Sequence, residues 1–211
     1  IKPEFEFLRP YSYKKMENDF GELVRSKFLV DVSGIKKLND GYNCEFADVC
    51  RPNIFLAHYI YPDLLNESDW NDVFDYALEK LWCDWKLDAI DGNEETSKAD
   101  SIGGGLSTID KSHGLYQSHH TGENNKSYHR GDSWFFVNNI AAICMHRLNK
   151  VKYKQYIEKI LHASTEDILF SGFIGYASEI SSSSELHSFG CFCQAWSVAT
   201  FIELIHELYV E

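Results

Sequence analysis

Apolar residues recur in this sequence at the spacing of an α-helix, in runs long enough to bury one helix face. The clearest runs comprise Trp70, Val73, Phe74, Ala77, Leu78 and Leu81, then Val137, Ile140, Ala141, Cys144 and Leu148, and then Val198, Phe201, Ile202, Ile205 and Leu208. Because residues three and four positions apart share a helix face, each run predicts an amphipathic helix. Further helices are predicted near residues 53–65 and 152–163, and a weaker one near residues 18–30. About six helices and no convincing alternating strand series predict an all-α fold.

Three of these helices have recognisable first residues. Pro52 fits the first turn of the 53–65 helix, where the backbone nitrogen needs no hydrogen-bond partner. Ser68 is predicted to begin the next helix. Asp132 or Ser133 is predicted to cap the free N–H groups of the helix that follows them.

Two long loops separate the helices, one from about Asp88 to Arg130 and the other from about Ser171 to Gly190. Loops of this length in compact domains tend to be functional or disordered. The first loop contains the glycine run (Gly103–Gly105), which no Gly-Lys-Ser/Thr follows, so we predict a flexible turn rather than a phosphate-binding loop. Both loops lead into strongly predicted helices, which favours a site at one end of a helical array.

Length and charge exclude several classes of protein. At 211 residues the chain is a single domain of ordinary size or a fragment of something longer, as its first residue, Ile1, also indicates. The net charge of −12 argues against a nucleic-acid binder, which needs a basic surface. No apolar stretch reaches the length of about 18 residues that a membrane span requires.

Cysteine and histidine spacing indicates neither disulfides nor a metal site. The six cysteines are Cys44, Cys50, Cys83, Cys144, Cys191 and Cys193. They are scattered and form no pair of CxxC-like motifs, so we predict mostly reduced, buried cysteines in a cytoplasmic protein. The histidines match no helix-borne or finger motif, and no metal is expected.

Two segments crowd polar, charged and aromatic side chains together. The first is Tyr128-His129-Arg130-Gly131-Asp132-Ser133-Trp134, in which helix capping does not explain the Tyr, His and Arg. The second places Glu179 in a loop, with Gln194 and Trp196 at the start of the next helix. A loop glutamate is ordinarily a solvated acid, but its carboxylate is also a candidate for acid–base catalysis.

Four blocks of residues occur in an order that resembles a known family. The blocks are Asp48-x-x-Arg51-Pro52-Asn53, Gly105-Leu106-Ser107-Thr108, Tyr128-His129-Arg130-Gly131-x-x-Trp134, and Glu179 followed by Gly190-Cys191-x-x-Gln194-Ala195-Trp196-Ser197. Together they resemble the C-terminal part of the amylo-α-1,6-glucosidase domain of archaeal-type glycogen debranching enzymes. Two departures are that Ser107 stands where the family has arginine, and that serines follow Glu179 where the family often has an acidic residue and glycine.

The resemblance implies an (α/α)6 toroid, a six-hairpin fold in which paired helices form inner and outer rings. The predicted helices of residues 1–211 would then form the C-terminal half of that toroid, as a single domain or a fragment of one. The active site would lie in the loops at one end of the toroid. Half a toroid would leave an apolar face uncovered, which implies self-association or contact with a missing N-terminal half.

The resemblance also implies hydrolysis of the single glucose left on an α-1,6 branch of an α-glucan or maltooligosaccharide. Inverting glycosidases use two carboxyl groups about 6.5–9.5 Å apart, one as general acid and one as general base. Glu179 matches the base of the family, and Glu185 is a competitor because of the altered sequence between them. The Trp-Met-Asp type segment that carries the acid is missing from this sequence, so we expect the chain alone to be inactive or nearly so. No cofactor is needed.

The expected substrate-binding residues are Arg51, Asn53, Tyr128, His129, Arg130, Trp134, Gln194 and Trp196. Hydrogen bonds to glucose hydroxyls would come from the side chains of Tyr128, His129, Arg130 and Gln194. The tryptophans would stack on the sugar or wall the pocket, with core packing an equal alternative for Trp196. Arg51 and Asn53 would line the pocket or brace it from behind.

Other functions fit the same residues. The missing acid and the serine-rich loop favour a non-catalytic carbohydrate-binding or assembly module on the same scaffold. A weaker alternative is a different enzyme on that scaffold, such as a trehalase-like or phosphorylase-like protein.

Overall fold

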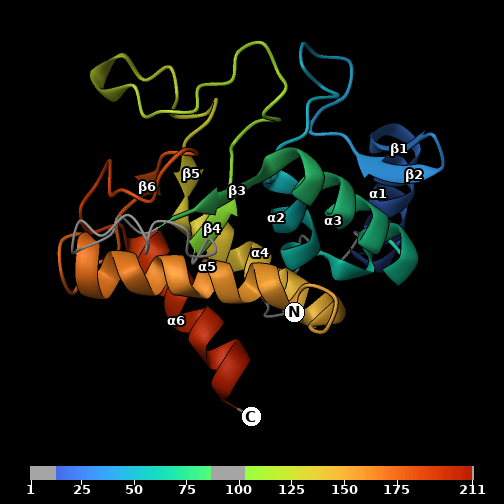
Figure 1. Ribbon diagram of the computed structural model, residues 1–211. Coiled ribbons are helices and arrows are strands. Elements are labelled where there is room, and N and C mark those ends of the chain that lie inside the picture. Colours follow the sequence, from blue (N-terminus) through green and yellow to red (C-terminus); the bar gives the residue numbers. More distant parts are fainter. Residues whose placement is uncertain (1–12, 87–102, 211) are drawn as a thin grey trace, which may run out of the picture.

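The computed structural model describes residues 13–86 and 103–210 and agrees with the prediction of a mainly helical fold (Figure 1). Its helices are α1 (Tyr13–Phe28), α2 (Asn53–Ile60), α3 (Glu67–Leu81), α4 (Phe135–Asn149), α5 (Lys154–Glu166) and α6 (Ala195–Tyr209). Within the described residues, no helix has both the length and the apolar character that a membrane span requires.

Three short antiparallel ribbons accompany the helices. Their strands are β1 (Leu29–Val32), β2 (Ile35–Leu38), β3 (Trp82–Trp85), β4 (Gly103–Leu106), β5 (Ser133–Trp134) and β6 (Ile180–Ser181). β1 pairs with β2, β3 with β4, and β5 with β6. These strands are too short for an alternating apolar pattern to reveal them in the sequence.

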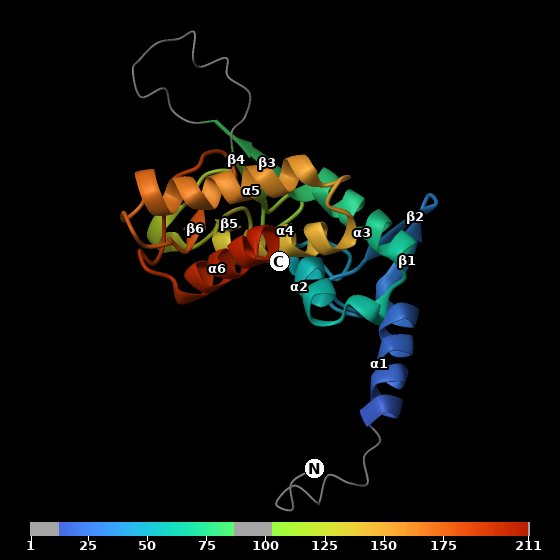
Figure 2. The ribbon, with the colours of Figure 1, turned by 90° about the horizontal axis from the view of Figure 1, so that it is seen from below.

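Helix α4 is the centre of the helical scaffold. It packs against α2, α5 and α6, and every residue from Ile140 to Met145 is buried. Burial on all sides requires a helix that is apolar all round, which this segment is. Figure 2 shows α1 standing apart from the other helices, next to the β1–β2 ribbon.

An aromatic cluster joins α2 and α3 to the start of α5. The ring centroids of Phe55 and Phe74 are 4.6 Å apart, and those of Phe74 and Tyr153 are 6.0 Å apart. Trp70 completes the cluster and donates from its indole N–H to the Pro62 carbonyl at 2.7 Å. The apolar face predicted for α3 is therefore the face that forms the core.

Each predicted helix is observed, with ends that differ from the prediction by a few residues. Helix α1 begins at Tyr13 rather than near residue 18, and α5 runs to Glu166 rather than to about residue 163. The 53–65 helix stops at Ile60, because Pro62 lacks an N–H and begins a short 3-10 turn instead. Pro52 lies just before this helix. Helix α3 begins earlier than Ser68, since the Asn66 side chain caps it by accepting from the Asp69 N–H at 2.9 Å.

The prediction of a flexible turn at the glycine run is wrong. These glycines are buried in β4, which pairs with β3 in register from Trp82↔Leu106 to Trp85↔Gly103. A Cβ on the second glycine would overlap the Trp82 indole, and one on the third would overlap the Trp85 indole. The missing side chains therefore make room for tryptophan rings.

The cysteines divide by location, and all six are free. Cys50, Cys83 and Cys144 are buried as predicted. Cys44, Cys191 and Cys193 are exposed, because they lie in loops outside the helical core.

The described parts of the two long loops meet at one end of the helices, in the upper left of Figure 1. The β5–β6 ribbon joins them through the pairs Ser133↔Ser181 and Trp134↔Ile180. The Ser184 N–H also donates to the Ser118 carbonyl at 3.0 Å. Residues 87–102 of the first predicted loop lie outside the described residues.

Substitution Gly105→Ala should lower the free energy of unfolding by about 1–3 kcal/mol, because the added methyl group overpacks the space beside Trp85. Gly114→Ala is the matched control, since nothing lies within 4 Å of a Cβ at that position. Urea unfolding monitored by circular dichroism measures both. Equal stability of the two variants would contradict the packing argument.

Candidate active site

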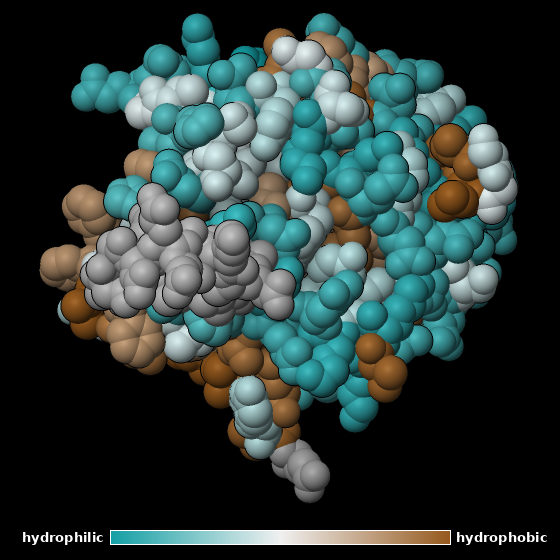
Figure 3. Space-filling model, viewed as in Figure 1, coloured by the Kyte–Doolittle hydropathy of each residue, from teal (hydrophilic) through white to brown (hydrophobic). Residues whose placement is uncertain are grey.

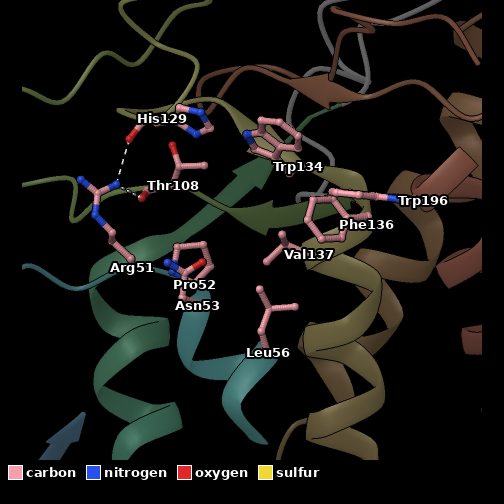
Figure 4. Close-up of a pocket in the computed structure, with 10 residues that line it drawn as sticks. All are labelled: Arg51, Pro52, Asn53, Leu56, Thr108, His129, Trp134, Phe136, Val137 and Trp196. Carbon is pink, nitrogen blue, oxygen red and sulfur yellow. Dashed lines mark hydrogen bonds between the residues drawn. The ribbon is translucent and has the colours of Figure 1, made fainter. Parts of the chain in front are cut away.

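A cavity of about 240 Å³ lies at the loop end of the scaffold (Figure 4). Its lining residues are Arg51, Pro52, Asn53, Leu56, Thr108, His129, Trp134, Phe136, Val137 and Trp196. They come from the start of α2, the segment after β4, the loop before β5, the β5–α4 junction and the first turn of α6. The cavity thus collects residues that are far apart in the sequence, including five of the predicted substrate-binding residues.

One side of the cavity is an aromatic wall. The rings of His129 and Trp134 are stacked, 5.6 Å apart and 8° from parallel. The ring contacts continue from Trp134 to Phe136 at 5.8 Å and from Phe136 to Trp196 at 5.1 Å. Trp196 is 61% exposed, so it lies at the mouth of the cavity and not in the core. Exposed ring faces of this kind suit stacking on a sugar.

The opposite side is polar, and Arg51 organises it. Its Nη1 donates to the carbonyl oxygens of Thr108 and His129, both at 3.0 Å (Figure 4). Its Nε lies 3.6 Å from the carboxylate of Asp40, which also accepts a hydrogen bond from the Asn53 amide at 2.8 Å. Arg51 therefore braces the cavity by joining three segments.

The Glu179 carboxylate is half-buried and held by two donors. One oxygen accepts a hydrogen bond from the Tyr128 hydroxyl, and the other accepts from the Cys191 N–H at 2.9 Å. Gly190 adopts a φ of +75°, and a Cβ there would collide with this carboxylate. Glu179, which its place in a loop would make an ordinary solvated acid, is thus held in a defined position.

Tyr128 connects Glu179 to the cavity. Its ring contacts those of Trp134 at 4.7 Å and His129 at 4.9 Å, although Tyr128 itself does not line the cavity. Burial, together with the hydrogen bond to the Glu179 carboxylate and its charge, raises the pKa of Tyr128 to about 12. The hydroxyl therefore keeps its proton at neutral pH and remains a donor.

Three other predicted residues lie apart from the cavity. The Arg130 side chain is exposed, and only its backbone forms hydrogen bonds within the described residues. Gln194 is half-buried at the start of α6, where its N–H donates to the Ala177 carbonyl at 2.9 Å. Glu185 is exposed, and its carboxylate has no hydrogen-bond or ion-pair partner among the described residues.

The prediction that Asp132 or Ser133 caps α4 is wrong. No side chain caps this helix, and Trp134 occupies the cap position. Ser133 lies in β5, and the first N–H of the helix, that of Phe135, donates to the Glu179 carbonyl at 3.3 Å. The β5–β6 ribbon takes the place of a side-chain cap and brings Glu179 to the beginning of α4.

Some cavity residues were not predicted. Phe136 lies in an apolar stretch that is typical of a helix interior. Asp40, which does not line the cavity but bonds to Arg51 and Asn53, lies in a segment with no recognisable motif and was not predicted either. Thr108 is part of the second resemblance block, which was the only signal for it. Among the described residues, no three His, Cys, Asp or Glu side chains gather as a metal site.

Arg51→Lys should lower the free energy of unfolding by about 1–3 kcal/mol, because one ammonium group cannot span both carbonyl oxygens and the Asp40 carboxylate. Arg130→Lys, at an exposed side chain of the same region, should change it by less than about 0.5 kcal/mol. Urea unfolding measures the stability of both variants. An Arg51→Lys variant as stable as the wild type would show that the contacts of Arg51 are not needed for stability.

Comparison with known proteins identifies the family. No protein with a curated description matches the chain. The family model described as amylo-alpha-1,6-glucosidase matches residues 2–203, which include all the cavity residues, Tyr128 and Glu179. The chain therefore belongs to the amylo-alpha-1,6-glucosidase family.

Proposed function

We propose that this chain binds an α-1,6-linked glucose in the cavity and that Glu179 is the general base for its hydrolysis with inversion. The observation that carries the proposal is the contact of Glu179 with Tyr128, whose ring adjoins the cavity residues His129 and Trp134. Glu185 is a weaker candidate for the base, because it is exposed and its carboxylate bonds to none of the described residues, whereas that of Glu179 bonds to Tyr128.

The size of the cavity supports a single sugar ring as its occupant. Pockets for drug-sized ligands span about 300–1,000 Å³, and this cavity, at about 240 Å³, is smaller. The glucose ring would stack on the aromatic wall formed by Trp134 and Trp196. Its hydroxyls would meet His129 and the polar side around Asn53 and Thr108.

In the proposed mechanism, Glu179 removes a proton from the water that attacks the anomeric carbon. A second carboxyl group protonates the departing α-1,6 oxygen from the other face of the sugar. Since the sequence has no Trp-Met-Asp segment, we propose that this acid comes from a part of the glucosidase domain that these 211 residues do not contain. Tyr128 orients the base by donating to one of its oxygens.

α-D-Glucosyl fluoride provides a test, since its leaving group needs little help from a general acid. We expect the chain to hydrolyse this compound to β-glucose, while it releases no glucose from a maltooligosaccharide bearing one α-1,6 glucose. Glu179→Gln should lower fluoride release at least about 100-fold, in line with the loss of a general base. Proton NMR of the first product identifies the anomer.

Glu185→Gln is the matched control and should retain full fluoride release. A loss with Glu185→Gln instead of Glu179→Gln would move the base to Glu185. Sugar binding without fluoride release, retained in Glu179→Gln, would favour a non-catalytic carbohydrate-binding module. Release of glucose from the α-1,6 substrate would show that the acid lies within the chain.

We also propose that these helices form half of an (α/α)6 toroid and that their apolar surface is covered by the other half or by a second copy. Helix α6 buries only Ser197 and Leu204, and it exposes Ile202 at 62% and Tyr209 at 69%. Figure 3 shows this apolar surface in brown along α6, at the lower end of the molecule. An apolar cavity of about 540 Å³ between α1 and α2 adds to the uncovered surface.

Ile202→Glu should therefore shift the isolated chain from dimers toward monomers in sedimentation velocity. Val151→Glu, at an 80% exposed residue between α4 and α5, should leave the association unchanged. A wild-type chain that stays monomeric at all concentrations would contradict self-association through α6.

A further inference from the structure

Two fully buried aspartates bond to residues next to Tyr128 and Glu179 in the sequence. Asp132 is 0% exposed and Asp167 is 1% exposed. Among the described residues, neither carboxylate has a Lys or Arg partner, and neither lines the cavity. Burying a carboxylate without a cation is costly unless hydrogen bonds compensate for the lost water. Asp167 accepts hydrogen bonds on both oxygens, whereas Asp132 accepts side-chain hydrogen bonds on Oδ2 and leaves Oδ1 buried without a partner among the described residues.

Asp132 closes the loop that carries Tyr128. Its Oδ2 accepts hydrogen bonds from His120 Nδ1 and from the Ser127 hydroxyl, both at 2.8 Å. The Ser127 hydroxyl also accepts from the Thr121 N–H at 2.9 Å. Tyr128 lies between Ser127 and Asp132 in the sequence, so this network fixes the turn from which Tyr128 reaches Glu179.

The same network reaches the segment that carries Glu179. The His120 ring stacks on Phe189 with centroids 4.3 Å apart and an angle of 22°. Phe189 exchanges backbone hydrogen bonds with Ile180, at 2.9 and 3.3 Å. Because Ile180 follows Glu179 directly, Asp132 acts on both partners of the Tyr128–Glu179 contact.

Asp167 holds the segment of Glu179 through two further hydrogen bonds. One of its oxygens accepts from the Ser178 N–H at 2.8 Å, and the other accepts from the Ser188 hydroxyl at 2.5 Å. Ser178 precedes Glu179, and Ser188 precedes Phe189. The carboxylate therefore joins the two strand-like arms that present Glu179 to Tyr128.

From this geometry we infer that Asp132 and Asp167 are positioning residues that hold Tyr128 and Glu179 in hydrogen-bond contact. The benefit for catalysis rests on the proposed role of Glu179 as the base, whereas the positioning itself does not. Neither aspartate touches the sugar site, so each acts through the residue that it orients.

The test is a double-mutant cycle for the hydrogen bond. Unfolding by urea is measured for wild type, Tyr128→Phe, Glu179→Ala and the double variant, and repeated in the backgrounds Asp132→Ala and Asp167→Ala. We expect the midpoint shifts to be non-additive in wild type and additive in both aspartate backgrounds. Asp132→Asn should restore non-additivity, because the amide oxygen can still accept from His120 and Ser127.

Tyr153→Phe is the control background. It loses half-buried hydrogen bonds to Asn71 and Asp75 that lie outside the candidate site, so stability should fall while the non-additivity remains. Should the alanine variants not fold, Ser127→Ala and Ser188→Ala each remove one donor from an aspartate and should weaken the non-additivity.

Undiminished non-additivity in the folded aspartate variants would overturn the inference, as would additivity already in wild type. The cycle uses neither sugar nor turnover, so its result is independent of the fluoride assay. Suppose that the aspartate variants abolish the non-additivity but Glu179→Gln has no effect on fluoride release. The positioning role of the aspartates would then stand, and the assignment of Glu179 as the base would fall.

Discussion

The hydrogen bond from Tyr128 to Glu179 joins two loops whose contacting residues are 51 positions apart in the sequence. The backbone ribbon between these loops is only two residues long on each side, which by itself gives little stability. Side-chain and aromatic contacts therefore do most to fix the loop end, and the site depends on polar networks more than on regular structure. The helical scaffold beneath, centred on α4, supplies a rigid base for them.

The helices could be predicted because their apolar residues repeat at a period that is local to each segment. Helix α3 illustrates this, since its predicted apolar face is the buried one. The glycine run could not be interpreted in the same way. Its conformation depends on Trp82 and Trp85, which come from another part of the chain, and a glycine carries no apolar pattern of its own. The toroid remains a prediction, as a single set of packed helices does not define its ring.

The site was partly predictable because the resemblance blocks contain the residues that the fold brings together. Arg51, Asn53, His129, Trp134 and Trp196 line one cavity. The sequence did not reveal which partners the polar side chains contact. Arg51 points to backbone carbonyl oxygens, and Asp132 turns to His120 rather than to the helix that follows it. Such choices depend on partners distant in the sequence. The roles of Glu179 and the sugar-binding residues remain predictions.

Three of the four residues of β4 are glycines, and the lack of side chains on this strand has a consequence for the site. A Cβ on Gly103 would lie 3.3 Å from the Cβ of Ala163, so helix α5 rests almost directly on the strand. The turn that follows α5 contains Asp167, which holds the segment of Glu179. A larger residue at Gly103 would push α5 outward and carry this anchor with it. The absence of a side chain at Gly103 thus lets α5 approach β4 closely and bears on the position of the Asp167 anchor at its end.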